Sequence, residues 1–229
     1  MRRGLQAVGR GASFRRRSLS VPGRTWRPAF VVAASYALGA VPFTNLAAQL
    51  TRGVDLRHVG NGTVSGTALY RTAGFTPLAA AGVLDVGKGA AGPLLLRDRP
   101  AAAALAGAAA VSGHNWSPFL RGAGGRGISP AMGALAVTAW PGSAILLVGL
   151  AGGRLAGETA VGSLVADAAL VPALARTRGR RAAAAGLAVL VPMIVKRVLG
   201  NAPPPRRSPA VYVTRLLVDR DNLRAGGGR

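Results

Sequence analysis

Apolar blocks alternate with short polar or basic segments along most of this chain. The blocks cover residues 29–50, 75–96, 101–112, 128–140, 142–152, 156–175 and 182–199. The first block holds no charged residue, and it has about the ~20 residues that a helix needs to cross a bilayer. Pro42 predicts a kink within it. The pattern predicts an all-α, polytopic integral membrane protein with six or seven transmembrane helices, because the two short blocks around Pro141 form either two spans or one kinked span.

The two ends of the chain have a different composition from the apolar blocks. Residues 1–28 are rich in arginine and lack a long apolar run, and residues 201–229 are rich in proline and arginine. Such segments cannot bury enough apolar surface to fold. We therefore predict two disordered tails, 1–28 and 201–229, around one transmembrane domain over 29–200.

The formal net charge of +22 raises nucleic acid as a partner. The charge is not arranged as a stripe on a soluble core, however. Eight arginines precede Ala29, and many others lie in the C-terminal tail or between apolar blocks, which is typical of membrane proteins. We therefore expect a lipid bilayer and no nucleic acid as the partner. The absence of cysteine and the wide spacing of two histidines and seven carboxylates predict no metal site, and no organic cofactor is expected.

The most informative polar segment is 113–127, GHNWSPFLRGAGGRG. Its glycines allow backbone N–H groups to approach a ligand closely, and the apolar helix that follows offers unpaired N–H donors at its start. The guanidinium of Arg126 matches a phosphate group. The segment predicts an anion site, although a glycine-rich turn alone also joins helices. His114 and Asn115 open it.

Asp85 and Lys88 interrupt the second apolar block. Residues three apart lie on the same face of a helix, and charged groups at membrane depth require a partner or a polar cavity. The spacing allows two interpretations. Lys88 either forms a mutual ion pair that stabilises the helix, or it lines a cavity and binds an anion.

Five motifs in the same order are similar to those of the bacterial acyl-phosphate:glycerol-3-phosphate acyltransferases. YALGAVP at 36–42 resembles the YLLGSIP of this family, and Asp55-Leu56-Arg57 with 60–71 resembles D-x-R followed by GSGNxGATNxxR. Segment 85–89 resembles D-x-x-KG. Segment 113–127 resembles GH-x-FP…GGKG, with arginine for lysine. Ser163-Leu164 resembles a later serine-leucine pair.

The chain departs from the family pattern in two places. In the first motif, Asn61 stands for serine, and Thr63 and Ala68 stand for two asparagines. The third motif, H-x-x-N-I-x-R-L…G-x-E, retains only Arg197, Leu199 and Gly200 as counterparts in LVPMIVKRVLGN. No histidine follows His114, so the histidine of that motif is absent.

The resemblance implies a multi-pass enzyme of the bacterial plasma membrane. It would transfer an acyl group from acyl phosphate to the sn-1 hydroxyl of glycerol 3-phosphate, giving lysophosphatidic acid for phospholipid synthesis. His114, Lys88 and Arg126 would be catalytic. The residues expected to bind substrate or phosphate are Gly60, Asn61, Gly62, Thr67, Arg71, Asp85, Asn115, Gly124, Gly125, Gly127 and Ser163.

Less specific interpretations remain for two of these side chains. His114 could instead hydrogen-bond backbone and shape its loop, and Ser163 could bond a carbonyl of its own helix. Two other functions stay open as well. The loss of the third motif favours a catalytically degenerate member that binds a phosphorylated ligand. A small transporter for a phosphorylated solute fits the intramembrane charges, but no inverted repeat is visible in the sequence.

Overall fold

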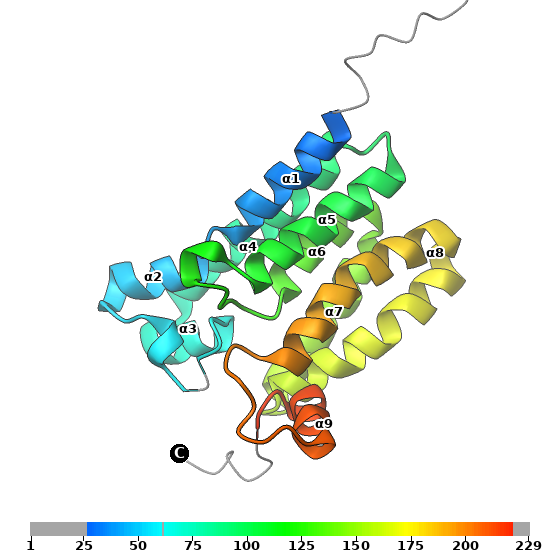
Figure 1. Ribbon diagram of the computed structural model, residues 1–229. Coiled ribbons are helices and arrows are strands. Elements are labelled where there is room, and N and C mark those ends of the chain that lie inside the picture. Colours follow the sequence, from blue (N-terminus) through cyan, green and yellow to red (C-terminus); the bar gives the residue numbers. More distant parts are fainter. Residues whose placement is uncertain (1–26, 61, 222–229) are drawn as a thin grey trace, which may run out of the picture.

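The computed structural model describes residues 27–60 and 62–221, and in these residues every regular element is helical. The long helices lie side by side in one bundle (Figure 1). The elements are α1 (Arg27–Ala40), α2 (Phe43–Arg52), α3 (Gly66–Ala73), α4 (Phe75–Leu95), α5 (Pro100–Asn115), α6 (Ile128–Thr138), α7 (Trp140–Leu155), α8 (Thr159–Leu199) and α9 (Pro209–Val218), with 3₁₀ turns η2 (Leu56–His58) and η3 (Pro118–Leu120).

The first apolar block is broken where its proline predicted a kink. Val41 and Pro42 separate α1 from α2. Proline lacks an N–H and its ring crowds the preceding turn, so the helix cannot continue straight through Pro42. The helix α2 turns away with α3, and both lie at the left of the bundle in Figure 1.

The longest helix, α8, folds back on itself at Gly179, whose φ of 78° and ψ of −175° are not helical. The predicted basic loop 176–181 is therefore a sharp reversal between two antiparallel limbs. Gly186 of the second limb packs against Leu170 and Leu174 of the first. The core contains apolar side chains of both limbs together with Val111, Ala131, Leu135 and Leu146 from α5, α6 and α7.

The two short apolar blocks around Pro141 are two helices, α6 and α7, that part at Ala139. Three segments in the described part of the chain are long and apolar enough to cross a membrane, namely Arg27–Arg52, Phe75–Leu95 and Thr159–Leu199. Small residues allow the shorter helices to pack closely among them. A side chain at Gly89 of α4, for example, would overlap the Pro130 carbonyl of α6.

Two predicted boundaries differ from the structure. His114 and Asn115 were expected in a loop, but they form the last turn of α5. The predicted C-terminal tail contains α9, which packs at the end of α8 (Figure 1). The reason is that Arg215 of α9 is buried and donates to the carbonyl of Leu199 at 2.5 Å, so one side chain caps α8 and fixes α9. The predicted N-terminal tail lies outside the described residues, apart from 27 and 28.

Candidate functional site

Asp85 of α4 is the centre of a buried polar cluster. Its Oδ2 accepts a hydrogen bond from Thr44 Oγ1 of α2 at 2.8 Å, and its Oδ1 lies 2.8 Å from Lys88 Nζ. The side chain of Lys88 is only 1% exposed. Its ammonium also donates to the carbonyl of Val41 at 2.8 Å, one of the groups left without a helical partner at the break before Pro42. The mutual ion pair that the spacing allowed is therefore present.

His114 connects this cluster to the glycine-rich segment. Its Nδ1 lies 3.7 Å from Asp85 Oδ1, which is longer than a hydrogen bond. On the other side of the ring, a side chain at Gly125 would overlap His114 Nε2. The backbone carbonyl of His114 accepts from Gly125 N–H at 3.3 Å. Only glycine fits at position 125, and it brings the GGRG backbone directly against the imidazole.

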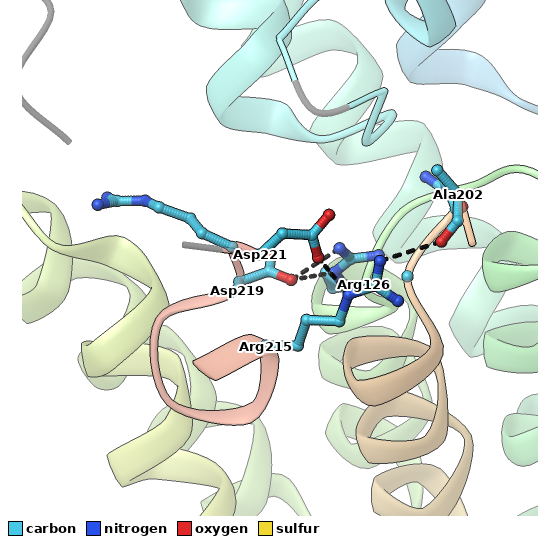
Figure 2. Close-up of a pocket in the computed structure, with 8 residues that line it drawn as sticks. Arg126, Ala202, Arg215, Asp219 and Asp221 are labelled. Atoms are coloured by element: carbon cyan, nitrogen blue, oxygen red, sulfur yellow. Dashed lines mark hydrogen bonds and ion pairs between the residues drawn. The ribbon is translucent and has the colours of Figure 1, made fainter. Parts of the chain in front are cut away.

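Arg126 is held by two other segments. Its Nε lies 2.7 Å from Asp219 Oδ1, which follows α9, and its Nη2 lies 3.1 Å from Thr63 Oγ1 of the first motif. Figure 2 shows the guanidinium directed at Asp219. Its Nη1 is buried and has no hydrogen-bond partner among the described residues. A buried donor without a partner is costly, so this atom is a candidate contact for an anion.

Asn201, just after α8, hydrogen-bonds to two glycine-containing loops, the one with Gly62 and the one with Gly124. Its Nδ2 donates to the carbonyls of Gly62 at 3.0 Å and Gly124 at 2.9 Å, and its Oδ1 accepts from Gly124 N–H at 3.2 Å. The N–H of Val64 also donates to the Gly124 carbonyl at 3.3 Å. The loop that resembles the first motif and the GGRG segment are thus joined by the Asn201 amide, by this backbone hydrogen bond and by Arg126 on Thr63.

Two further expected residues pack beside this junction. Gly127 has a φ of 78°, which only glycine adopts without strain, and it opens α6. Asn115 is fully buried and donates from Nδ2 to the Pro192 carbonyl at 2.8 Å. That bond ties the end of α5 to the second limb of α8.

Ser163 makes no hydrogen bond to the groups described above among the bonds of its hydroxyl, which join Ala160 and Arg197. Its Oγ donates to the carbonyl of Ala160 in its own helix at 3.0 Å and accepts from Arg197 Nη1 at 3.0 Å. The first contact is the bond to a carbonyl of its own helix that the sequence allowed. The second contact shows that Arg197, a counterpart of the third motif, also reaches it.

The remaining expected residues lie on the loop and helix after α2. Gly60 and Gly62 have positive φ, and Thr67 is in the first turn of α3. Arg71, at the end of α3, is exposed. Asn61 lies outside the described residues. Nearby, Arg57 Nη2 lies 2.6 Å from Asp55 Oδ2. Hydrogen bonds from Arg57 lower the pKa of Asp55 to about 2.

Several cluster members were not predicted. Thr44, Asn201 and Asp219 carry no motif signal on their own, because their roles depend on contacts over 41, 77 and 93 positions. Lys196 is buried and donates to the Gly122 carbonyl at 3.1 Å. It stands directly before Arg197, in the segment where the third motif was sought. Within residues 27–60 and 62–221, no cluster of His, Cys, Asp and Glu suits a metal ion.

The arrangement suits an anionic ligand at one end of the bundle. Arg126, the backbone of 124–127 and His114 converge there, and Lys88 lies behind His114 through Asp85. Oriented backbone N–H groups and a guanidinium stabilise phosphate oxygens and developing negative charge.

The chain is similar to known proteins over most of its length. The family model "Glycerol-3-phosphate acyltransferase" matches residues 29–201. The protein of that name from Jannaschia sp. (strain CCS1) is 38% identical over 176 residues, which are 73% of this chain and 83% of the relative. The one from Synechococcus sp. (strain CC9902) is 34% identical over 169 residues, 72% and 84% of the two chains.

A solved structure has the same fold. It is the crystal structure of PlsY (YgiH), an integral membrane glycerol 3-phosphate acyltransferase, in its glycerol 3-phosphate form. The TM-score is 0.67 at 24% sequence identity, over 75% of this chain and 88% of that chain. The helical bundle described above is therefore that of a polytopic membrane protein, and the chain belongs to the glycerol-3-phosphate acyltransferase family.

Proposed function

We propose that this protein acylates glycerol 3-phosphate with an acyl phosphate and produces lysophosphatidic acid for phospholipid synthesis. The sn-1 hydroxyl oxygen forms an ester bond with the acyl carbon. The bond between that carbon and the phosphate oxygen breaks, and inorganic phosphate leaves. The hydroxyl proton moves to a base or to a phosphate oxygen. These bond changes and the proton transfer account for the whole reaction without a metal or an organic cofactor.

The observation that carries the proposal is the junction of His114 with Gly125. It places the buried Asp85–Lys88 pair and the Arg126 segment on either side of one imidazole. Both substrates carry phosphate, so the site must hold two anions close together. Arg126 and the N–H groups of 124–127 would bind one phosphate. Arg71 stands exposed on the adjoining helix α3, where it would meet a second anion.

Lys88 and His114 would act at the reacting carbon. An ammonium has three N–H donors, and Asp85 with the Val41 carbonyl accounts for two of them. The third would stabilise negative charge on the leaving phosphate or the tetrahedral oxyanion, which is usually the largest contribution to such catalysis. His114 would either accept the hydroxyl proton or orient Gly125. A substrate phosphate oxygen would then take the proton, since acyl phosphate has a good leaving group.

The other expected residues would support this site from its rim. Gly60, Asn61, Gly62 and Thr67 belong to the loop and helix that Asn201 fastens to Gly124. Ser163 would act more remotely through Arg197. We further propose that the protein resides in the bacterial plasma membrane. The degenerate alternative is not retained, because relatives named as the enzyme match this chain over more than four fifths of their own length.

An acyl-transfer assay on the detergent-purified protein tests the proposal. It would follow radiolabelled glycerol 3-phosphate into lysophosphatidic acid with palmitoyl phosphate as the donor. Arg126→Ala and Lys88→Ala are each expected to lower kcat/KM by 100-fold or more, in line with the ~10²–10³ effect of one oxyanion donor. Arg121→Ala is the matched control, because Arg121 is an exposed arginine of the same loop.

The outcome separates three cases. Product with wild type and Arg121→Ala, but not with the other two variants, supports both the reaction and the site. Equal turnover by all four proteins would remove Arg126 and Lys88 from the site. No product from wild type that still binds glycerol 3-phosphate would contradict the acyl-transfer proposal.

A further inference from the structure

The segment 202–221 lies beyond the residues that the family model matches, yet it reaches Arg126. The helix α9 ends at Val218, and Asp219 follows with a left-handed φ of 55°. This turn directs the carboxylate of Asp219 at the guanidinium, with Oδ1 at 2.7 Å from both Nε and Nη2 (Figure 2).

Asp219 contacts Nε and Nη2 of Arg126, so that among the described residues only Nη1 is left without a partner for a second anion. The Nε and Nη2 groups form one two-pronged donor face, which matches two oxygens of a carboxylate or phosphate. Two anions cannot share that face without strong mutual repulsion. The hollow beside it is lined by Arg126, Asn201, Arg215, Asp219 and Asp221, among others. A phosphate that enters this hollow therefore meets a carboxylate already bound to the arginine.

The contacts that hold Asp219 in place differ in strength. Arg215 is buried and donates to the carbonyls of Leu199 and Ala202, at 2.5 and 3.1 Å, so α9 itself is firmly attached to α8. The turn after α9 is held by Asp221, which pairs with Arg215, and by Arg220, which lies 3.0 Å from Glu158 at the start of α8. The side chains of this second ion pair are 32% and 46% exposed, and exposed pairs are weak. The turn that carries Asp219 can thus open, by breaking the pairs of Arg220 with Glu158 and of Arg215 with Asp221, whose carboxylates are both almost half exposed, while α9 stays in place through the Leu199 and Ala202 contacts.

We propose that Asp219 competes with the phosphate of the substrate for Arg126 and thereby sets the apparent affinity for glycerol 3-phosphate. The inference rests on the proposed function of Arg126 as a phosphate ligand. Substrate binds only to the fraction of molecules in which Asp219 has left the guanidinium, so the apparent affinity is reduced by that fraction. Glu158 and Arg220 increase the occupied fraction without touching Arg126.

The test compares Asp219→Asn with wild type in two measurements. The first is the KM for glycerol 3-phosphate in the acyl-transfer assay, and the second is the Kd for inorganic phosphate by calorimetry on the purified protein. An amide has no charge to compete with phosphate. We expect both constants to fall by about three- to tenfold, with kcat not reduced. Glu158→Gln should shift both constants in the same direction by a smaller factor.

Asp98→Asn is the matched control. It also removes one exposed carboxylate, but from the loop between α4 and α5, which does not line the hollow beside Arg126. A higher KM or Kd in Asp219→Asn would overturn the proposal and make Asp219 a residue that positions Arg126 for substrate. Unchanged constants beside an active wild type would also overturn it. If no protein makes lysophosphatidic acid but Asp219→Asn binds phosphate more tightly, the competition stands and the proposed reaction fails.

Discussion

Asp85 balances the charge of a lysine that is otherwise sealed inside the bundle. Removing one partner of a buried pair leaves an uncompensated charge, which costs about 3–5 kcal/mol. Asp85→Asn should therefore lower the free energy of unfolding by about that amount, because the Lys88 ammonium would lose its counter-charge and keep only neutral acceptors. The measurement is thermal unfolding of the purified protein in detergent, followed by circular dichroism.

Two companion variants separate charge from hydrogen bonding at this position. Thr44→Val removes the hydrogen bond to Asp85 Oδ2 but leaves the ion pair, so its loss should be smaller, about 1.5–3 kcal/mol. The double variant Asp85→Asn with Lys88→Met removes both charges and should recover most of the lost stability. A double variant as unstable as Asp85→Asn alone would contradict this account.

Among the helices, the reversal of α8 depends on the backbone of a single residue. Gly179 has a φ of 78° and a ψ of −175°, a combination essentially restricted to glycine, and no atom lies within 4 Å of a Cβ built there. Gly179→Ala should therefore destabilise the fold by about 1–3 kcal/mol through backbone strain alone. Thermal unfolding of this variant beside wild type measures the effect.

Gly82 in α4 is the matched control for that variant. It also has open space around its Cβ position but lies in a regular helix without positive φ. Alanine there should stabilise the helix by up to about 1 kcal/mol. Opposite signs for the two substitutions are expected. Equal effects would mean that the strain at Gly179 is not what sets the reversal.

The hydrophobic pattern predicts the apolar helices well because a bilayer imposes length and composition on each span. It predicts the bounds of α4 to within one residue and the position of the break at Pro42. It fails for α9, since the preceding prolines and arginines hide a short apolar run whose fold depends on Arg215 capping α8. It also misplaces His114, because a glycine before it suggested a turn where close packing against α1 requires a helix.

For the molecule as a whole, the site is assembled from segments that are remote in sequence. Motif order predicts that Gly124 and Arg126 belong to one site with Lys88 and the first glycine loop. It does not predict what joins them, because a side chain's partner over many positions leaves no periodic signal. That partner is Asn201, which lies 139 positions from Gly62 and 77 from Gly124.

Asn201→Asp is therefore expected to separate the two loops while leaving the bundle intact. Aspartate has the shape of asparagine but no donor, so a carboxylate would face the carbonyls of Gly62 and Gly124, from which Nδ2 now lies 3.0 and 2.9 Å. We expect kcat/KM in the acyl-transfer assay to fall by tenfold or more, since small displacements of positioning groups have large effects on rate.

The circular dichroism spectrum should not change, because Asn201 lies two residues after Leu199, where α8 ends, and belongs to no helix. Thr214→Val is the control, as Thr214 is only half-buried on α9 and its hydroxyl donates to the Ala210 carbonyl of its own helix. Full activity in Asn201→Asp would mean that the bonds from Val64 N–H to the Gly124 carbonyl and from Arg126 to Thr63 are enough to keep the two loops in place. A retained spectrum with lost activity would instead identify the end of α8, where the third family motif has diverged, as the support that holds the two glycine loops in register.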